Sequence, residues 1–170
     1  MVKTNALIST VIMALIPFCA NAANQGQGVV NFKGSVINAA CGIVSESADQ
    51  SIDFGQISVS HLKADGISVK KSIQIELANC EPDKSVKVTF SGTTVSGAKT
   101  ELGTSGNTGT AIVISAQNGS LIEFGAEGAA HQLKEGKNTL QFLSWVKKAS
   151  GSNVTEGDFT AVANFNLSYS

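Results

Sequence analysis

The sequence contains no arginine: all twelve of its basic residues are lysine. Arginine is the side chain that most often reads phosphates and base edges, because its planar guanidinium donates two parallel hydrogen bonds. Thirteen acidic residues bring the formal net charge to −1, so the chain has no strong positive potential that would attract a polyanion. The Lys70-Lys71 and Lys147-Lys148 pairs lack interleaved aromatics and are predicted to be solvated charges at strand ends. We expect no nucleic-acid partner.

Residues that carry catalytic or metal chemistry are also scarce. The chain has two histidines, His61 and His131, both in polar contexts and predicted to lie at the surface. A catalytic triad needs a serine, a histidine and an acid brought together, and no serine sits in a Gly-x-Ser-x-Gly elbow. No Cys-x-x-Cys pair or zinc-type cluster is present. The sequence therefore predicts a protein that is not an enzyme, with no cofactor, no bound metal and no small-molecule substrate.

The one long apolar run, residues 6–18, stands near the start of the chain. It is shorter than the roughly 20 residues that a membrane-spanning helix needs. Lys3 precedes it, and Ala20-Asn21-Ala22 follows with small residues of the kind that signal peptidase reads. We therefore predict a signal peptide over residues 1–22, cleaved before Ala23.

Export leaves two cysteines, Cys41 and Cys80. In an oxidising compartment two such cysteines are expected to form one disulfide. The loop it closes is long enough for the chain-entropy model to give about 4 kcal/mol of stabilisation. The mature chain is close to the usual size of one domain, so a single domain with a full core is predicted.

Apolar and polar residues alternate with the period of β-strands rather than helices in many short runs. Turn-forming stretches rich in Gly, Asn and Ser separate these runs, as in residues 103–109 and 150–153. Short strands separated by turn-forming segments are typical of an antiparallel sandwich. The predicted strands are residues 72–77, 85–90, 111–114, 139–146 and 159–169.

Both ends of the mature chain have strand character. At the front, five residues of one parity would share a face in an extended chain, and they precede the first mature cysteine: Gly26, Gly28, Val30, Phe32 and Gly34. A strand without a partner in its own domain is available to another molecule. At the back, the sequence ends on the alternating run 159–169. A sandwich that ends on a strand can leave the next strand position empty, which exposes a backbone edge and a hydrophobic groove.

Six motifs, in this order along the chain, resemble the major pilins of the chaperone–usher class, in particular the P-pilus and type 1 rod subunits of Gram-negative bacteria. Each motif alone is weak, but the ordered set spans the mature chain. They are residues 26–34 (GQGVVNFKG), 36–41 (VINAAC), 47–56 (SADQSIDFGQ), 75–80 (IELANC), 106–113 (GNTGTAIV) and 155–169 (TEGDFTAVANFNLSY).

The resemblance implies an all-β fold: an incomplete immunoglobulin-like β-sandwich that lacks its final strand. A donor strand from a periplasmic chaperone, and then from a neighbouring subunit, completes it. Residues 23–34 would be the N-terminal donor-strand extension and residues 35–170 the pilin domain. The five residues of the front segment would face inward, and Gly28 would be the notch glycine that lets an incoming strand displace the chaperone stepwise.

The resemblance also implies that the C-terminal strand contacts both the chaperone and the donor. Gly157, fourteenth from the end, and the penultimate aromatic Tyr169 match the family's C-terminal signature. The edge residues implied are Gly157, Phe159, Ala161, Ala163, Phe165, Leu167 and Tyr169.

The function implied is that of a structural subunit of a pilus rod that supports bacterial surface adhesion. Its partners would be the periplasmic chaperone, an outer-membrane usher, and identical and other pilin subunits, and its location the cell-surface fimbrium. The alternative is a minor fimbrial adaptor or ligand-binding pilin near the tip. A tip adhesin would need a further lectin domain, for which the chain is too short, and a terminator would lack a usable donor strand.

Overall fold

The computed structural model describes residues 28–34, 36 and 39–170. The chain divides into two units, residues 1–36 and 37–170, which are described separately. The predicted signal peptide and Gly26 lie outside the described residues. Among the helices of the described ranges, none is long and apolar enough to cross a membrane.

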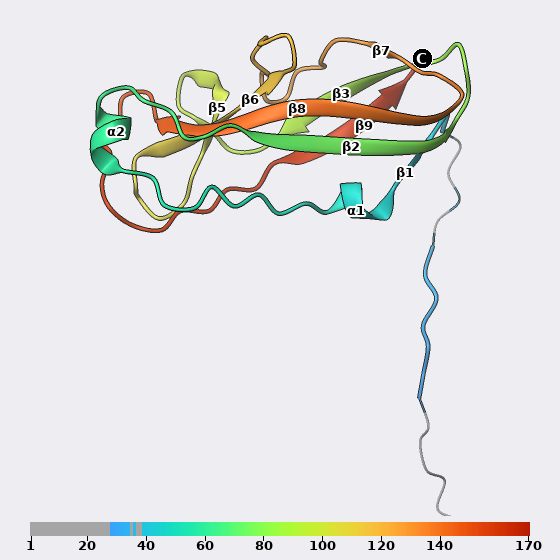
Figure 1. Ribbon diagram of the computed structural model, residues 1–170, viewed down its shortest axis with the longest axis horizontal. Helices are drawn as coiled ribbons and strands as arrows, with labels where there is room; N and C mark the ends of the chain where they lie inside the picture. Colours follow the sequence, from blue (N-terminus) through green and yellow to red (C-terminus); the bar gives the residue numbers. More distant parts are fainter. Residues whose placement is uncertain (1–27, 35, 37–38) are drawn as a thin grey trace, which may run out of the picture. The chain divides into compact units, whose positions relative to one another are not determined.

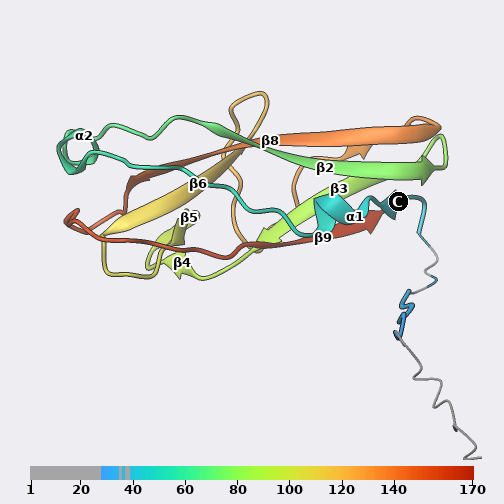
Figure 2. The same cartoon turned by 60° about the horizontal axis from the view of Figure 1, so that its bottom comes forward.

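The second unit consists of two antiparallel sheets (Figures 1 and 2). The larger sheet has the order β1-β2-β8-β6-β5-β4, and the smaller has the order β7-β3-β9. The strands of the larger sheet are β1 (Gly42–Ile43), β2 (Lys71–Cys80), β8 (Gly136–Lys148), β6 (Thr110–Ala116), β5 (Ala98–Gly103) and β4 (Thr94–Val95). Those of the smaller are β7 (His131–Gln132), β3 (Ser85–Ser91) and β9 (Asn164–Tyr169).

The core lies between the two sheets and follows from the alternation in the sequence. On β3, Val86, Val88 and Phe90 are buried while Lys87 and Thr89 between them are partly exposed. The ring of Phe90 meets that of Phe142 on β8 edge-on, with 5.0 Å between centroids, a favoured aromatic geometry. The predicted strands 72–77, 85–90, 111–114 and 139–146 are thus confirmed, and the structure extends each of them at one or both ends.

The predicted disulfide between Cys41 and Cys80 is present. Both cysteines are buried, and β1 pairs with the end of β2 beside them. A further hydrogen bond, from the Glu81 amide to the Ala40 carbonyl at 2.9 Å, closes the same region. The crosslink therefore joins the beginning of the folded unit to the end of a central strand.

The predicted strand over residues 159–169 is too long, because β9 begins only at Asn164. A strand requires a hydrogen-bonded neighbour, and β3 ends at Ser91, which pairs with Asn164. Residues 159–163 run beyond the end of β3. Two short helices that the sequence did not predict also occur, α1 (Ser45–Ala48) and α2 (Val59–Lys63).

The histidines differ in their environments. His61 is exposed, as predicted. His131, predicted to lie at the surface, is instead half-buried, with its ring 6.3 Å from that of Phe142.

A buried carboxylate, Glu101 on β5, ties the larger sheet to the loop that follows β8. Its oxygens accept hydrogen bonds from the Lys147 ammonium at 2.6 Å and from the amide and hydroxyl of Ser150 at 2.8 and 2.7 Å. Desolvation by burial raises the pKa of Glu101, but the hydrogen bonds from Lys147 and Ser150 outweigh it, so the pKa is lowered overall. The ionised carboxylate is therefore the form that fits this site.

We predict that Glu101→Gln destabilises the fold by about 1–3 kcal/mol at neutral pH, because a neutral amide cannot satisfy the Lys147 ammonium and both Ser150 donors. The contribution of Glu101 is fully present above the pKa of an unfolded glutamate, about 4.3. It is lost as the pH falls through the lower folded-state pKa. Urea unfolding of the two proteins across this range measures it. The stability difference between them should narrow on acidification, and a constant difference would contradict the assignment.

Candidate functional site

The first wall of the candidate site is the segment between α1 and α2, residues 49–57. It alternates over residues 52–54, where Ile52 and Phe54 are half-buried against the core and Asp53 is exposed; Gly55 at φ +64° breaks the alternation, and Ile57 is again half-buried. In the described part of the chain, no backbone–backbone hydrogen bond joins this segment to another. The Gly55 amide donates to the Asp53 carboxylate at 2.7 Å. The other backbone groups of the segment have no hydrogen-bond partner among the described residues and can pair with an added strand.

The second wall consists of residues 154–163 and β9. This wall is fixed to the loop before β6 by hydrogen bonds from the Thr155 amide to the Thr108 carbonyl (3.0 Å) and from the Ser105 amide to the Thr160 carbonyl (2.8 Å). Gly106 adopts φ +87°, and a Cβ there would collide with the Asp158 carbonyl. Glycine is therefore required for this close approach.

A groove separates the two walls. It has two connected parts, of about 560 Å³ and 680 Å³, that share Ile52 and Phe54. In both views the α1–α2 connection and the chain leading to β9 run along one side of the sandwich (Figures 1 and 2). The floor of the first part is apolar and comes from both sheets: Ile73, Phe90, Leu102, Ile112 and Ile114.

Five of the seven predicted C-terminal edge residues line this groove: Gly157, Phe159, Ala161, Ala163 and Phe165. Those on β9 are less covered than the residues of the adjacent β3. Phe165 and Leu167 on β9 are only half-buried, whereas Val86 and Val88 on the adjacent β3 are at most 2% exposed. Phe159, Ala161 and Tyr169 are also half-buried, while Gly157 and Ala163 are exposed. β9 is the last strand of its sheet and pairs with β3 alone among the described residues. The core is thus uncovered along one edge.

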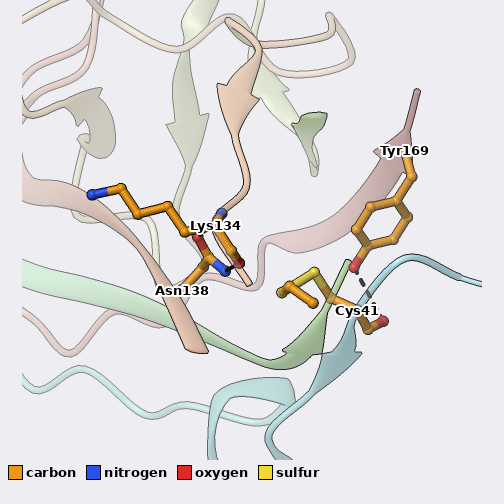
Figure 3. Close-up of a disulfide and its surroundings, with 5 residues drawn as sticks. Cys41, Lys134, Asn138 and Tyr169 are labelled. Carbon is orange, nitrogen blue, oxygen red and sulfur yellow. Dashed lines mark hydrogen bonds between the residues drawn. A yellow bond between two sulfur atoms is a disulfide. The ribbon is translucent and has the colours of Figure 1, made fainter. Parts of the chain in front are cut away.

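The C-terminus is anchored beside the disulfide. The Tyr169 hydroxyl lies 3.4 Å from the Cys41 carbonyl oxygen and donates to it (Figure 3). Burial raises the pKa of the Tyr169 phenol, so the hydroxyl stays protonated and remains a donor. The amide of Ser170 donates to the Ser85 carbonyl at 3.0 Å, which continues the pairing of β9 with β3 to the last residue.

The front segment belongs to the first unit, and its apolar side chains are open to solvent. Val30 is 73% exposed and Phe32 91% exposed. Nothing lies within 4 Å of the positions that a Cβ would take at Gly28 and Gly34. The sequence interpretation missed Val36, which has the same parity and is fully exposed. Continuing the alternation past Gly34 would have found it.

A sandwich with one open edge, a groove along that edge and an exposed alternating segment in front define a subunit that is completed by a strand from another chain. Comparison with known proteins identifies the family to which such a subunit belongs. The family model described as "Fimbrial protein" matches residues 30–170. The chain belongs to the fimbrial protein family.

Individual relatives support the same family assignment. The Pap fimbrial major pilin protein of Escherichia coli is 45% identical over 185 aligned positions, which include 99% of this chain and all of the relative. The crystal structure of the P pilus rod subunit PapA superposes with a TM-score of 0.75 at 46% identity, over 78% of this chain and all of that one. A subunit in the structure of a chaperone–usher pilus gives a TM-score of 0.80 at 48% identity, over 86% and 97% of the two chains.

The chain is accordingly a structural subunit of the major-pilin kind, and these rod-forming relatives favour the rod over the adaptor alternative. The predicted incomplete immunoglobulin-like sandwich is confirmed. The individual donor and edge residues remain predictions.

We predict that Ala161→Trp blocks assembly, because Ala161 lines the groove and packs against its floor, so an indole there would occupy the space of a strand. Asn166→Trp is the matched control, because Asn166 on β9 is exposed and lies outside the groove lining. The measurement is the mass of filaments sheared from the cell surface, normalised to the number of cells. Equal loss in both variants would mean that bulk near β9, and not occupation of the groove, is responsible.

Proposed function

We propose that this chain is the major subunit of a fimbrial rod and polymerises by donor-strand exchange. The groove of one copy takes the front segment of the next copy, residues 26–36. The observation that carries the proposal is the open edge of β9 above an apolar groove, on a chain whose own front segment is extended and exposed.

Strand addition supplies main-chain hydrogen bonds to both walls, and alternate side chains of the added strand fill the groove. Burying Val30 and Phe32 contributes about 1.5–3 kcal/mol each. Val36 extends the apolar set of the donor by one position. Because the acceptor completes its core only on binding, release requires partial unfolding and the joint is kinetically stable. Assembly in this scheme needs no nucleotide and no catalytic residue, so the role is structural and not enzymatic.

The exposed core edge also accounts for the expected partners. A subunit with an uncovered apolar groove is prone to aggregation, so a periplasmic chaperone lends it a strand after export. An outer-membrane usher then brings subunits together, and the product is a filament at the cell surface that supports adhesion. The alternative is a minor adaptor near the tip. A rod subunit dominates sheared filaments, whereas an adaptor is scarce in them.

The decisive experiment supplies the missing strand in the same chain. We predict that a protein lacking residues 23–36, with a copy of residues 24–36 attached after Ser170 through a short turn, is monomeric and unfolds cooperatively. The same protein without the attached strand should fold poorly, because its groove stays uncovered. Thermal unfolding and sedimentation measure both properties. Equal stability of the two forms would show that the sandwich is already closed, and the donor-strand proposal would fail.

In the intact chain, we predict that Phe32→Asp abolishes filaments, since a buried, unpaired carboxylate in the groove costs several kcal/mol. Asn31→Asp is the matched control, because residue 31 has the opposite parity and faces away from the groove when Phe32 enters it. Electron microscopy and the yield of sheared filaments are the measurements. Normal filaments from Phe32→Asp would contradict the predicted donor face.

A further inference from the structure

The rims of the groove are acidic. Each wall contributes two exposed carboxylates, Asp49 and Asp53 on one side and Glu156 and Asp158 on the other. None of the four takes part in an ion pair of the described residues, and no lysine lines either part of the groove. Four uncompensated charges of one sign beside a low-dielectric groove focus a negative potential there.

The front segment has the complementary charge. Between residues 23 and 36 the only ionisable side chain is Lys33. It stands between Phe32 and Gly34, so it has the opposite parity from the apolar stripe. When Phe32 points into the groove, Lys33 points outward, to the level of the rims.

The direction of the added strand decides which carboxylates Lys33 meets. Every strand pairing of the sandwich is antiparallel, so the strand that continues the smaller sheet is expected to run antiparallel to β9. Its C-terminal part, residues 32–36, then lies beside the chain that precedes β9. This is the part of the groove whose lining includes Asp53 on one wall and Asp158 on the other.

The apolar neighbours at that level support the same register. Phe54 and Phe159 line this part of the groove and pack against the smaller buried cluster of Leu62, Val146 and Val154. Since the inward residues of the two walls are aromatic here, their neighbours Asp53 and Asp158 face outward and are exposed. An outward lysine on a strand between the walls thus has a carboxylate on each side.

We propose that Lys33 of the donor copy is held between Asp53 and Asp158 of the acceptor copy, and that this charge pairing speeds docking and fixes the register. The inference rests on the proposed donor-strand function and adds the determinant of register to it. A slip of two residues leaves the same parity facing inward, so the apolar alternation alone discriminates weakly between registers. A single charge at one level removes that ambiguity, because a slip moves it away from its partners.

The test uses the mature full-length chain carrying Phe32→Asp as the acceptor, and a synthetic peptide of residues 24–36 as the donor. The acceptor is refolded in the presence of peptide. Association is followed by the fluorescence of Trp145, the one tryptophan of the chain, and confirmed by size-exclusion chromatography. The peptide with Lys33→Glu should associate about tenfold more slowly at low ionic strength, and the difference should shrink as salt screens the charges.

Charge reversal of the acceptor provides the second arm. Asp53→Lys together with Asp158→Lys should invert the preference, so that the Lys33→Glu peptide associates faster than the wild-type peptide. Glu81→Lys with Asp83→Lys is the matched control, because both of these carboxylates are exposed and lie outside the groove lining. This control should leave the preference unchanged.

The outcomes separate the two proposals. If a Phe32→Asp peptide associates as well as the wild-type peptide, donor-strand entry itself is wrong. If that peptide fails but Lys33→Glu matches wild type at every salt concentration, the charge pairing alone is overturned. Should the charge-reversed acceptor not refold, the salt dependence of wild-type, Lys33→Gln and Lys33→Glu peptides on the unreversed acceptor still decides the question. A neutral peptide of intermediate rate supports the pairing, and three equal rates refute it.

Discussion

The smaller sheet ends on β9, and the rest of the molecule depends on the backbone hydrogen bonds that β9 makes on one side only. Its pairing with β3 holds the C-terminus in place, while its other edge meets no strand in the described part of the chain. An unpaired edge beside uncovered apolar side chains is a liability for a soluble monomer. For a subunit that must join others, the same feature stores the driving force for assembly, because the core is completed only when a second chain arrives.

The two walls show how the open edge is kept open. The wall that precedes β9 is fixed to the loop before β6 through Thr155 and Ser105, and Gly106 lets the chains approach closely. The facing wall, residues 49–57, stays extended without a backbone partner. One wall of the groove is therefore anchored to its neighbour by hydrogen bonds, while the other has no backbone–backbone bond among the described residues. The carboxylates on these rims give the opening a charge as well as a shape.

Alternation in the sequence was sufficient to predict the strands that bury a full core, because β2, β3 and β8 present one apolar face to it. The same signal overestimated the last strand: residues 159–163 alternate, but whether they form a strand depends on how far β3 extends, which is a tertiary property. The helices α1 and α2 are too short to show a helical period. Glu101 could not have been found, since Lys147 and Ser150 are distant in sequence. Of the candidate site, the alternation in the sequence was sufficient to propose which residues of the front segment share a face. Val36 was missed because the alternation was followed only as far as Gly34.

The position of the disulfide has a mechanical consequence. In the proposed filament, tension pulls each subunit at two places: at the strand bound in its groove and at the chain that leaves its own front end. That chain enters the folded unit at Cys41, where the bond to Cys80 transmits the load directly into β2, the neighbour of β8 in the larger sheet. Tyr169 donates to the Cys41 carbonyl from the strand that borders the groove. Force therefore passes between the two attachment points through a covalent crosslink and strand pairing, and the first residues cannot be peeled away from the body one hydrogen bond at a time.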